Sequence, residues 1–157
     1  MKFTKFVKSL GTDGVIYETS NGNRWLATAA VFMRIPDGVQ SVTGCAVREM
    51  PEPIERIITQ IGRSADAVLW RAVMPQPDSA IKDCIRVYKA HDALECPICN
   101  DAWTLIEKGD MCEIQFAYDL DTNKYEPKAL LVKRYPDNPA DDDIELVGII
   151  FPANIEI

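Results

Sequence analysis

Apolar residues recur at helical spacing in three short segments of the chain. In residues 3–10 the apolar side chains fall on one side and the lysines on the other, which predicts an amphipathic helix. Residues 52–62 carry four isoleucines three or four positions apart, and the prolines near their start are tolerated in a first helical turn. Residues 101–108 precede Gly109-Asp110, a natural stop. We therefore expect two or three short helices.

Runs that are rich in β-branched and aromatic residues predict strands between and after these helices. Two such runs, residues 14–19 and 24–35, flank Asn21-Gly22. Asn-Gly is a strong hairpin signal, because both central residues of a tight turn need positive φ. A second hairpin is expected around residues 119–123. The other expected strands cover residues 39–48, 66–74, 84–89, 93–98, 111–118, 124–135 and 144–151.

One segment of the chain resembles another that lies one hundred residues later. Asn23–Asp37 and Asn123–Asp137 align without a gap and share identical Asn, Ala, Arg, Pro and Asp residues. At two further positions a basic residue faces a basic one and an aromatic residue faces an aromatic one. We interpret the pair as a duplicated hairpin arm.

The order of the expected elements extends this interpretation to the whole chain. It predicts an α+β protein of pseudo-duplicated helix-hairpin-strand units that form a mostly antiparallel sheet. We expect a single domain, residues 1–157, with related halves at about residues 1–50 and 84–157. A helix and a strand within residues 51–76 are expected to join the halves.

The composition is typical of a globular protein, with 47% hydrophobic and 26% charged residues among 157. The net charge of −7 excludes a protein that coats nucleic acid with its whole surface, although it permits a local basic patch. No run approaches the roughly 20 apolar residues of a membrane span, and the lysine-containing N-terminus is unlike a secretory signal. We therefore expect a cytoplasmic protein.

Five cysteines and one histidine raise the question of metal or redox chemistry. Cys96 and Cys99 have the CxxC spacing that lets two thiolates meet one metal ion or form a redox pair. No second CxxC accompanies them, so we favour the interpretation that they are small apolar residues near the end of a strand. A zinc-stapled structural protein stays as an alternative, and we expect no cofactor. The remaining candidate ligands are Cys84, His91 and Cys112.

Enzyme motifs are missing from the sequence, which lacks G-x-S-x-G, a phosphate-binding glycine loop and H-E-x-x-H. We therefore expect no catalytic residues. Acidic residues instead concentrate in a proline-rich loop and at the start of the last expected strand. Such a run can imitate a phosphate backbone and present negative charge to a basic groove. The candidate partner-binding residues are Asp137, Asp141, Asp142, Asp143 and Glu145.

Basic residues are segregated in the first expected helix. Lys2, Lys5 and Lys8 lie about one turn apart, and no acidic residue occurs among residues 1–12. The three lysines are candidate contacts to DNA phosphates, each releasing a condensed counterion on binding. The alternative is the solvated side of an amphipathic surface helix.

The order of helix and hairpin over Phe3–Ile35 and Asp101–Tyr135 resembles the repeat of the DNA sliding-clamp (processivity factor) fold. The resemblance implies helices that face duplex DNA, sheets that form an outer wall, and copies joined through sheet edges. The three lysines would then face the DNA. The other two expected helices contain acidic residues and offer no basic inner face, and a ring would require several copies of this chain.

These features give a ranked set of functions. The first is a non-enzymatic, clamp-like module for DNA replication that acts as a homo-oligomer. The second is an inhibitor of a host nucleic-acid-handling protein, a DNA mimic of the anti-CRISPR or other anti-defence type, because the small acidic chain is similar to bacteriophage accessory proteins. The expected partner is DNA or a DNA-handling protein, with no membrane and no small-molecule substrate.

Overall fold

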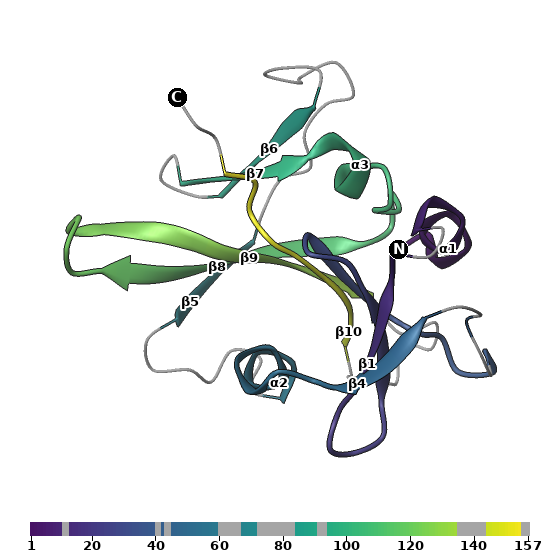
Figure 1. Cartoon of the computed structure of the whole chain (residues 1–157). Coiled ribbons are helices and arrows are strands. Elements are labelled where there is room, and N and C mark those ends of the chain that lie inside the picture. Colours follow the sequence, from purple (N-terminus) through teal and green to yellow (C-terminus); the bar gives the residue numbers. More distant parts are fainter. Residues whose placement is uncertain are drawn as a thin grey trace.

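The computed structural model describes residues 1–10, 13–39, 42, 45–59, 67–71, 84–90, 94–134 and 144–154. This part of the chain is mixed α+β, with an eight-stranded, mostly antiparallel sheet, a two-stranded sheet and three short helices (Figure 1). The helices are α1 (Phe3–Leu10), α2 (Glu52–Thr59) and α3 (Asn100–Trp103). The strands are β1 (Val15–Glu18), β2 (Arg24–Ala27), β3 (Val31–Arg34), β4 (Ala46–Glu49), β5 (Ala67–Arg71), β6 (Ile85–Lys89), β7 (Glu95–Cys99), β8 (Met111–Asp119), β9 (Lys124–Arg134) and β10 (Glu145–Ile150).

Two three-stranded antiparallel meanders, β1-β2-β3 and β8-β9-β10, lie side by side in the centre of the large sheet. Its strand order is β4-β1-β2-β3-β10-β9-β8-β5. The third strands of the two meanders, β3 and β10, pair antiparallel with Met33 opposite Gly148. At one edge β4 pairs parallel with β1, and at the other β5 pairs antiparallel with β8. The strands β6 and β7 pair only with each other among the described elements.

Hydrophobic clusters lie on both faces of the sheet, because successive side chains of a strand point to opposite faces. On one face Leu130 and Val132 of β9 pack in a cluster with α1, α3 and the β6–β7 hairpin. On the other face Ala129 and Leu131 pack in a second cluster, against which the isoleucines of α2 lie. The helix α2 therefore lies on the opposite face of the sheet from α1 and α3 (Figure 1).

Most of the expected elements are confirmed. The first helix covers residues 3–10 as expected, and α2 begins at Glu52; its expected end near residue 62 lies outside the described residues. The β8–β9 hairpin forms with the expected pairing, and the strands expected at residues 84–89 and 93–98 are β6 and β7, which pair antiparallel. In the described part of the chain, no helix is both long and apolar enough to cross a membrane.

The expectation of one continuous strand over residues 24–35 is wrong. β2 ends at Ala27, and a turn leads into β3. The backbone N–H of Thr28 donates to the carbonyl of Val31 (2.9 Å), and the Thr28 hydroxyl accepts from the N–H of Val31 (3.2 Å). A threonine that bonds to nearby backbone in this way favours a turn over a β-ladder. The aligned residues 124–134 form a single strand, so the two matched segments fold differently.

Three further expectations need correction. The third helix stops at Trp103 rather than 108, because its last turn tightens: the N–H of Leu105 donates to Ala102 (3.1 Å) and that of Ile106 to Trp103 (3.1 Å). In the described residues, the expected strand 39–48 is found only as β4 (Ala46–Glu49), and residues 40, 41, 43 and 44 lie outside the description. The Asn21-Gly22 turn has positive φ only at Gly22 (87°), because the connection between β1 and β2 is five residues long rather than a two-residue loop.

Candidate partner-binding site

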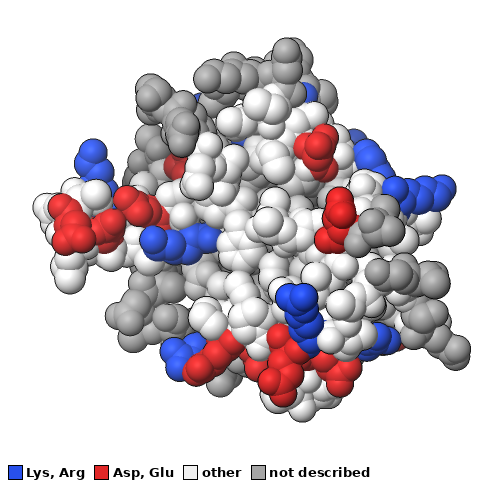
Figure 2. All heavy atoms as spheres, viewed as in Figure 1, with Lys and Arg blue, Asp and Glu red and all other residues white. Residues whose placement is uncertain are grey.

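Of the three lysines expected to contact DNA, Lys5 and Lys8 lie on α1 and Lys2 directly precedes its first residue. Lys2, Lys5 and Lys8 are all exposed, while Phe6 and Leu10 on the opposite side of the helix are buried against the sheet. Basic side chains are visible on the side of the molecule where α1 lies (Figure 2). The helix and the residue before it therefore present three positive charges outward, as the periodicity predicted.

The acidic run near the C-terminus is only partly described. Asp137, Asp141, Asp142 and Asp143 lie outside the described residues. Glu145 begins β10, and its carboxylate forms an ion pair with the guanidinium of Arg34. The described part of this run is therefore already engaged within the molecule.

A different acidic surface is formed where the ends of β1 and β4 meet α2. A groove of about 390 Å³ lies there, and acidic side chains gather along this edge of the molecule in Figure 2. Three of its six lining residues are glutamates, and none of the six is basic. The lining residues are Glu18, Thr19, Ser20, Glu49, Met50 and Glu55. We call this surface the acidic groove.

Strand pairing places two of these carboxylates side by side. Glu18 of β1 is the register partner of Glu49 of β4, and both side chains are exposed. Like charges directly opposite each other on neighbouring strands destabilise a sheet. On the side away from β4, Glu18 is the register partner of Arg24 of β2. Arg24 places one positive charge beside the two glutamates. A cationic group bound between the two glutamates would relieve their repulsion.

The third carboxylate is fixed in position by the β1–β2 turn. Glu55 Oε1 accepts hydrogen bonds from the backbone N–H of Ser20 (2.8 Å) and from its hydroxyl (2.6 Å). These hydrogen bonds lower the pKa of Glu55, with the hydroxyl bond as the larger cause, because both stabilise the ionised form. The groove therefore holds a negative charge that is both ionised and oriented at neutral pH.

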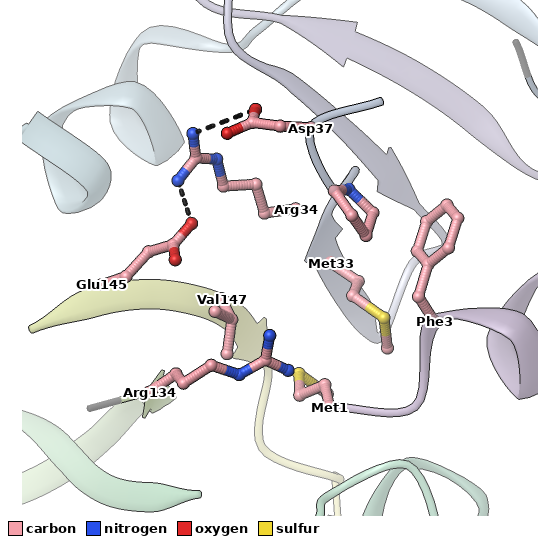
Figure 3. A pocket seen from close by; sticks show the side chains of 9 residues that line it. Met1, Phe3, Met33, Arg34, Asp37, Arg134, Glu145 and Val147 are labelled. Carbon is pink, nitrogen blue, oxygen red and sulfur yellow. Dashed lines mark hydrogen bonds and ion pairs between the residues drawn. The ribbon is translucent and has the colours of Figure 1, made fainter. Parts of the chain in front are cut away.

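A second cavity, of about 160 Å³, lies between the ends of β3 and β10 and the N-terminal segment (Figure 3). Arg34 and Arg134, one of the residue pairs matched between the two halves of the sequence, both line it. Arg34 also approaches Asp37 (3.9 Å), and Arg134 lies 3.6 Å from Glu107. Asp37 and Glu145 also line it, and the apolar part of the lining comes from Met1, Phe3, Met33, Pro36 and Val147. Both arginines of this cavity are therefore already paired with carboxylates.

Two of the five cysteines are core residues, whereas Cys84 is exposed and Cys45 and Cys99 are partly buried. Cys96 and Cys112 are buried, and burial raises the pKa of each thiol to about 12. Tyr88, fully buried near Cys112, has its pKa raised by burial and by the neighbouring thiol. Within the described residues no group of three His, Cys, Asp or Glu side chains is placed to hold a metal ion. A thiol that stays protonated at neutral pH is a poor nucleophile.

Comparison with known proteins adds no family assignment. No protein-family model matches the chain, and neither the search of curated proteins nor the search of solved structures found a match. The candidate site therefore depends on the geometry alone.

Sequence reasoning missed the acidic groove because its three glutamates come from separate elements. Glu18 and Glu49 are thirty-one positions apart and meet only through the parallel pairing of β1 with β4. A parallel neighbour leaves no short-range signal in the sequence, unlike a hairpin turn. The one local signal is the Glu-Met-Pro-Glu run at 49–52, which marks an acidic helix start.

Proposed function

We propose that the protein is a non-enzymatic binding module that captures a basic partner protein in its acidic groove. The observation that carries this proposal is the row formed by Glu18 and Glu49 beside the oriented carboxylate of Glu55. A lysine or arginine of the partner would pair with the carboxylates that line this groove. A partner whose cleft normally binds nucleic acid offers such side chains, so an inhibitor that mimics DNA is the class of function we favour.

The test combines two substitutions, Glu18→Gln and Glu49→Gln, in one chain. Both side chains are exposed, so we expect the fold to be retained and to gain a few tenths of a kcal/mol as the repulsion is removed. Capture of the basic partner should nevertheless weaken about tenfold or more. A matched control carries Asp13→Asn and Asp101→Asn, which change the net charge equally at exposed positions outside the groove.

Capture is measured with the immobilised chain and the purified partner, first identified from a lysate. Competition by duplex DNA should release the partner if the groove occupies a nucleic-acid-binding cleft. Equal loss of capture in both double variants would mean that only the total charge matters, which contradicts a defined site. A captured partner without a basic cleft would also contradict the proposal.

A second candidate function is direct association with DNA through α1, in a clamp-like manner, and the exposure of Lys2, Lys5 and Lys8 on one side of the helix supports it. Three phosphate contacts predict a log–log salt slope of about −2.7. Fluorescence anisotropy with a labelled duplex should show binding that is lost when all three lysines become Glu. The matched control replaces three other exposed lysines, Lys89, Lys124 and Lys128, with Glu. Salt-insensitive binding, or none, would rule this candidate out.

We further propose that the two meanders descend from one duplicated unit. The order α1-β1-β2-β3 repeats as α3-β8-β9-β10, and the third strands pair with each other. The different folding of residues 24–34 and 124–134 weighs against a residue-by-residue duplication. The order of helices and strands therefore supports the duplication better than the residue-by-residue alignment does.

A further inference from the structure

The strand β4 forms one edge of the large sheet, and β1 is its only neighbour among the described strands (Figure 1). All four of its residues, Ala46–Glu49, have exposed side chains. Val47 is 55% exposed although its register partner on β1, Ile16, is buried. This edge of the sheet is therefore open to solvent.

The backbone of β4 offers hydrogen-bonding groups on its open side. The N–H of Met50, directly after the strand, donates to the carbonyl of Glu18 on β1 at 3.0 Å. Successive residues of a strand direct their N–H and C=O groups to opposite sides, so Arg48 also faces β1 while Val47 and Glu49 face away from it. An edge that presents such groups is a template for pairing with another chain.

The side chains of β4 define what a pairing strand must carry. Val47 and Glu49 lie on one face of the sheet, because they are two positions apart, and Arg48 lies on the other. Glu18 shares the face of Glu49, because the two are register partners. A complementary strand therefore carries an apolar residue opposite Val47, an acidic one opposite Arg48 and a basic one opposite Glu49, at the acidic groove.

Pairing of β4 with the β4 strand of a second copy is disfavoured by charge. Side chains directly opposite each other must lie on the same face, so no antiparallel register of the two strands places Arg48 opposite Glu49. A two-fold axis at either of these residues places like charges opposite each other, and an axis at Val47 places Glu49 opposite Cys45. The charges of this edge therefore select a different chain.

We propose that β4 receives an extended segment of the basic partner as an added antiparallel strand, a mode of peptide recognition that reuses the free edge of a sheet. This inference rests on the proposed function and adds how the partner is held. Backbone hydrogen bonds at Val47 and Glu49 hold the segment, and its basic residue reaches the acidic groove beside Glu18. From its N-terminal side the segment reads basic, acidic and apolar, facing Glu49, Arg48 and Val47 in turn.

The test titrates the 15N-labelled chain with a synthetic peptide of this pattern, acetyl-Thr-Arg-Glu-Val-Thr-amide, to about 2 mM, a range suited to a short segment. Nuclear magnetic resonance should show shifted amide signals at Val47 and Glu49, whose N–H groups gain acceptors. Methylation of the backbone nitrogens of the peptide's Arg and Val removes the N–H groups that face β4, and it should weaken binding about tenfold or more. The matched control methylates its Glu and its second Thr, whose N–H groups face away, and should bind as the parent peptide does.

A substitution in the protein makes the same test from the other side. Val47→Pro removes an N–H that faces away from β1, so the β1–β4 pairing should be retained while peptide binding falls about tenfold. Val47→Thr is the matched control, because it keeps both the N–H and a β-branched side chain, and it should retain binding. Should Val47→Pro fail to fold, the methylated peptides still decide.

The outcomes separate this inference from the proposed function. Equal binding by all three peptides, equal weakening by both methylations, or no binding at all would overturn strand addition. If the double variant Glu18→Gln, Glu49→Gln still weakens capture of the partner in that case, the acidic groove stands as a site for side chains alone. Amide shifts at Val47 and Glu49 that follow the concentration of the chain without peptide would indicate a second copy at this edge and overturn the inference. Peptide binding that the double variant leaves unchanged would overturn both the inference and the proposed function.

Discussion

Replacement of Gly148 by alanine tests whether the N-terminal residue is packed into the sheet as the structure places it. Gly148 lies in the middle of β10, between Met33 of β3 and Val132 of β9. A Cβ atom added there would lie 1.9 Å from the sulfur of Met1, far inside van der Waals contact. Neighbouring strands hold β10 on both sides, so its backbone has little freedom to retreat.

Met1 has little freedom to move away either. It is only 5% exposed, and its ammonium group donates a hydrogen bond to Asp110 Oδ2 at 2.7 Å. The next residue is tied down as well, because the N–H of Lys2 donates to the carbonyl of Leu105 at 2.7 Å. Gly148→Ala must therefore overpack the core or expel the Met1 side chain, and either change costs about 1–3 kcal/mol.

Urea unfolding followed by circular dichroism and tryptophan fluorescence measures the loss. We expect Gly148→Ala to lower the free energy of unfolding by about 1–3 kcal/mol, without a change in the slope of this free energy against urea concentration. Gly109→Ala is the control, because nothing lies within 4 Å of its added Cβ and it should stay within about 0.5 kcal/mol of the parent chain. If Gly148→Ala is as stable as this control, Met1 does not occupy the position described.

Three further predictions concern charged and thiol groups. Cys84 is exposed and should react with a maleimide at about pH 8 at least 100-fold faster than buried Cys96, because the raised pKa of Cys96 keeps its thiol protonated. Equal reaction rates, measured by mass spectrometry, would contradict the placement of Cys96 in the core. Glu113→Gln should lower the free energy of unfolding by up to about 3 kcal/mol, because it leaves the buried ammonium of Lys133 without the carboxylate 2.6 Å away. Lys133→Met should cost less, and the reverse order in urea unfolding would refute this. The folded state lowers the pKa of Glu55, so its contribution to the free energy of unfolding is present at neutral pH and is lost as the pH falls through that pKa. The stability difference between the parent chain and Glu55→Gln should therefore shrink on acidification. A difference that grows would be inconsistent with the hydrogen bonds at the Glu55 carboxylate.

Local pattern was sufficient for elements whose signal lies within a few residues. The apolar stripe of α1 places Phe6 and Leu10 inside and the lysines outside, because helical periodicity fixes which side chains share a side. The β8–β9 hairpin followed from two runs of strand-forming residues separated by a short polar turn, whereas β6 and β7 were expected as strands without their pairing. The same reasoning failed between Ala27 and Val31, where a single threonine hydroxyl turns the chain and no glycine or proline marks the break.

The sequence by itself determined that this chain is a mixed α+β protein with a basic helix face and a predominantly antiparallel sheet. Only the tertiary structure decided which carboxylates gather at the acidic groove, which face of the sheet α2 covers, and which described residues of the β8–β9 hairpin are flanked by β5 and β10. The physical reason is that these features depend on pairing between segments far apart in the chain. The parallel partner of β1 and the register of β5 and β10 beside the β8–β9 hairpin follow from how the strands assemble, and no local residue pattern encodes either one.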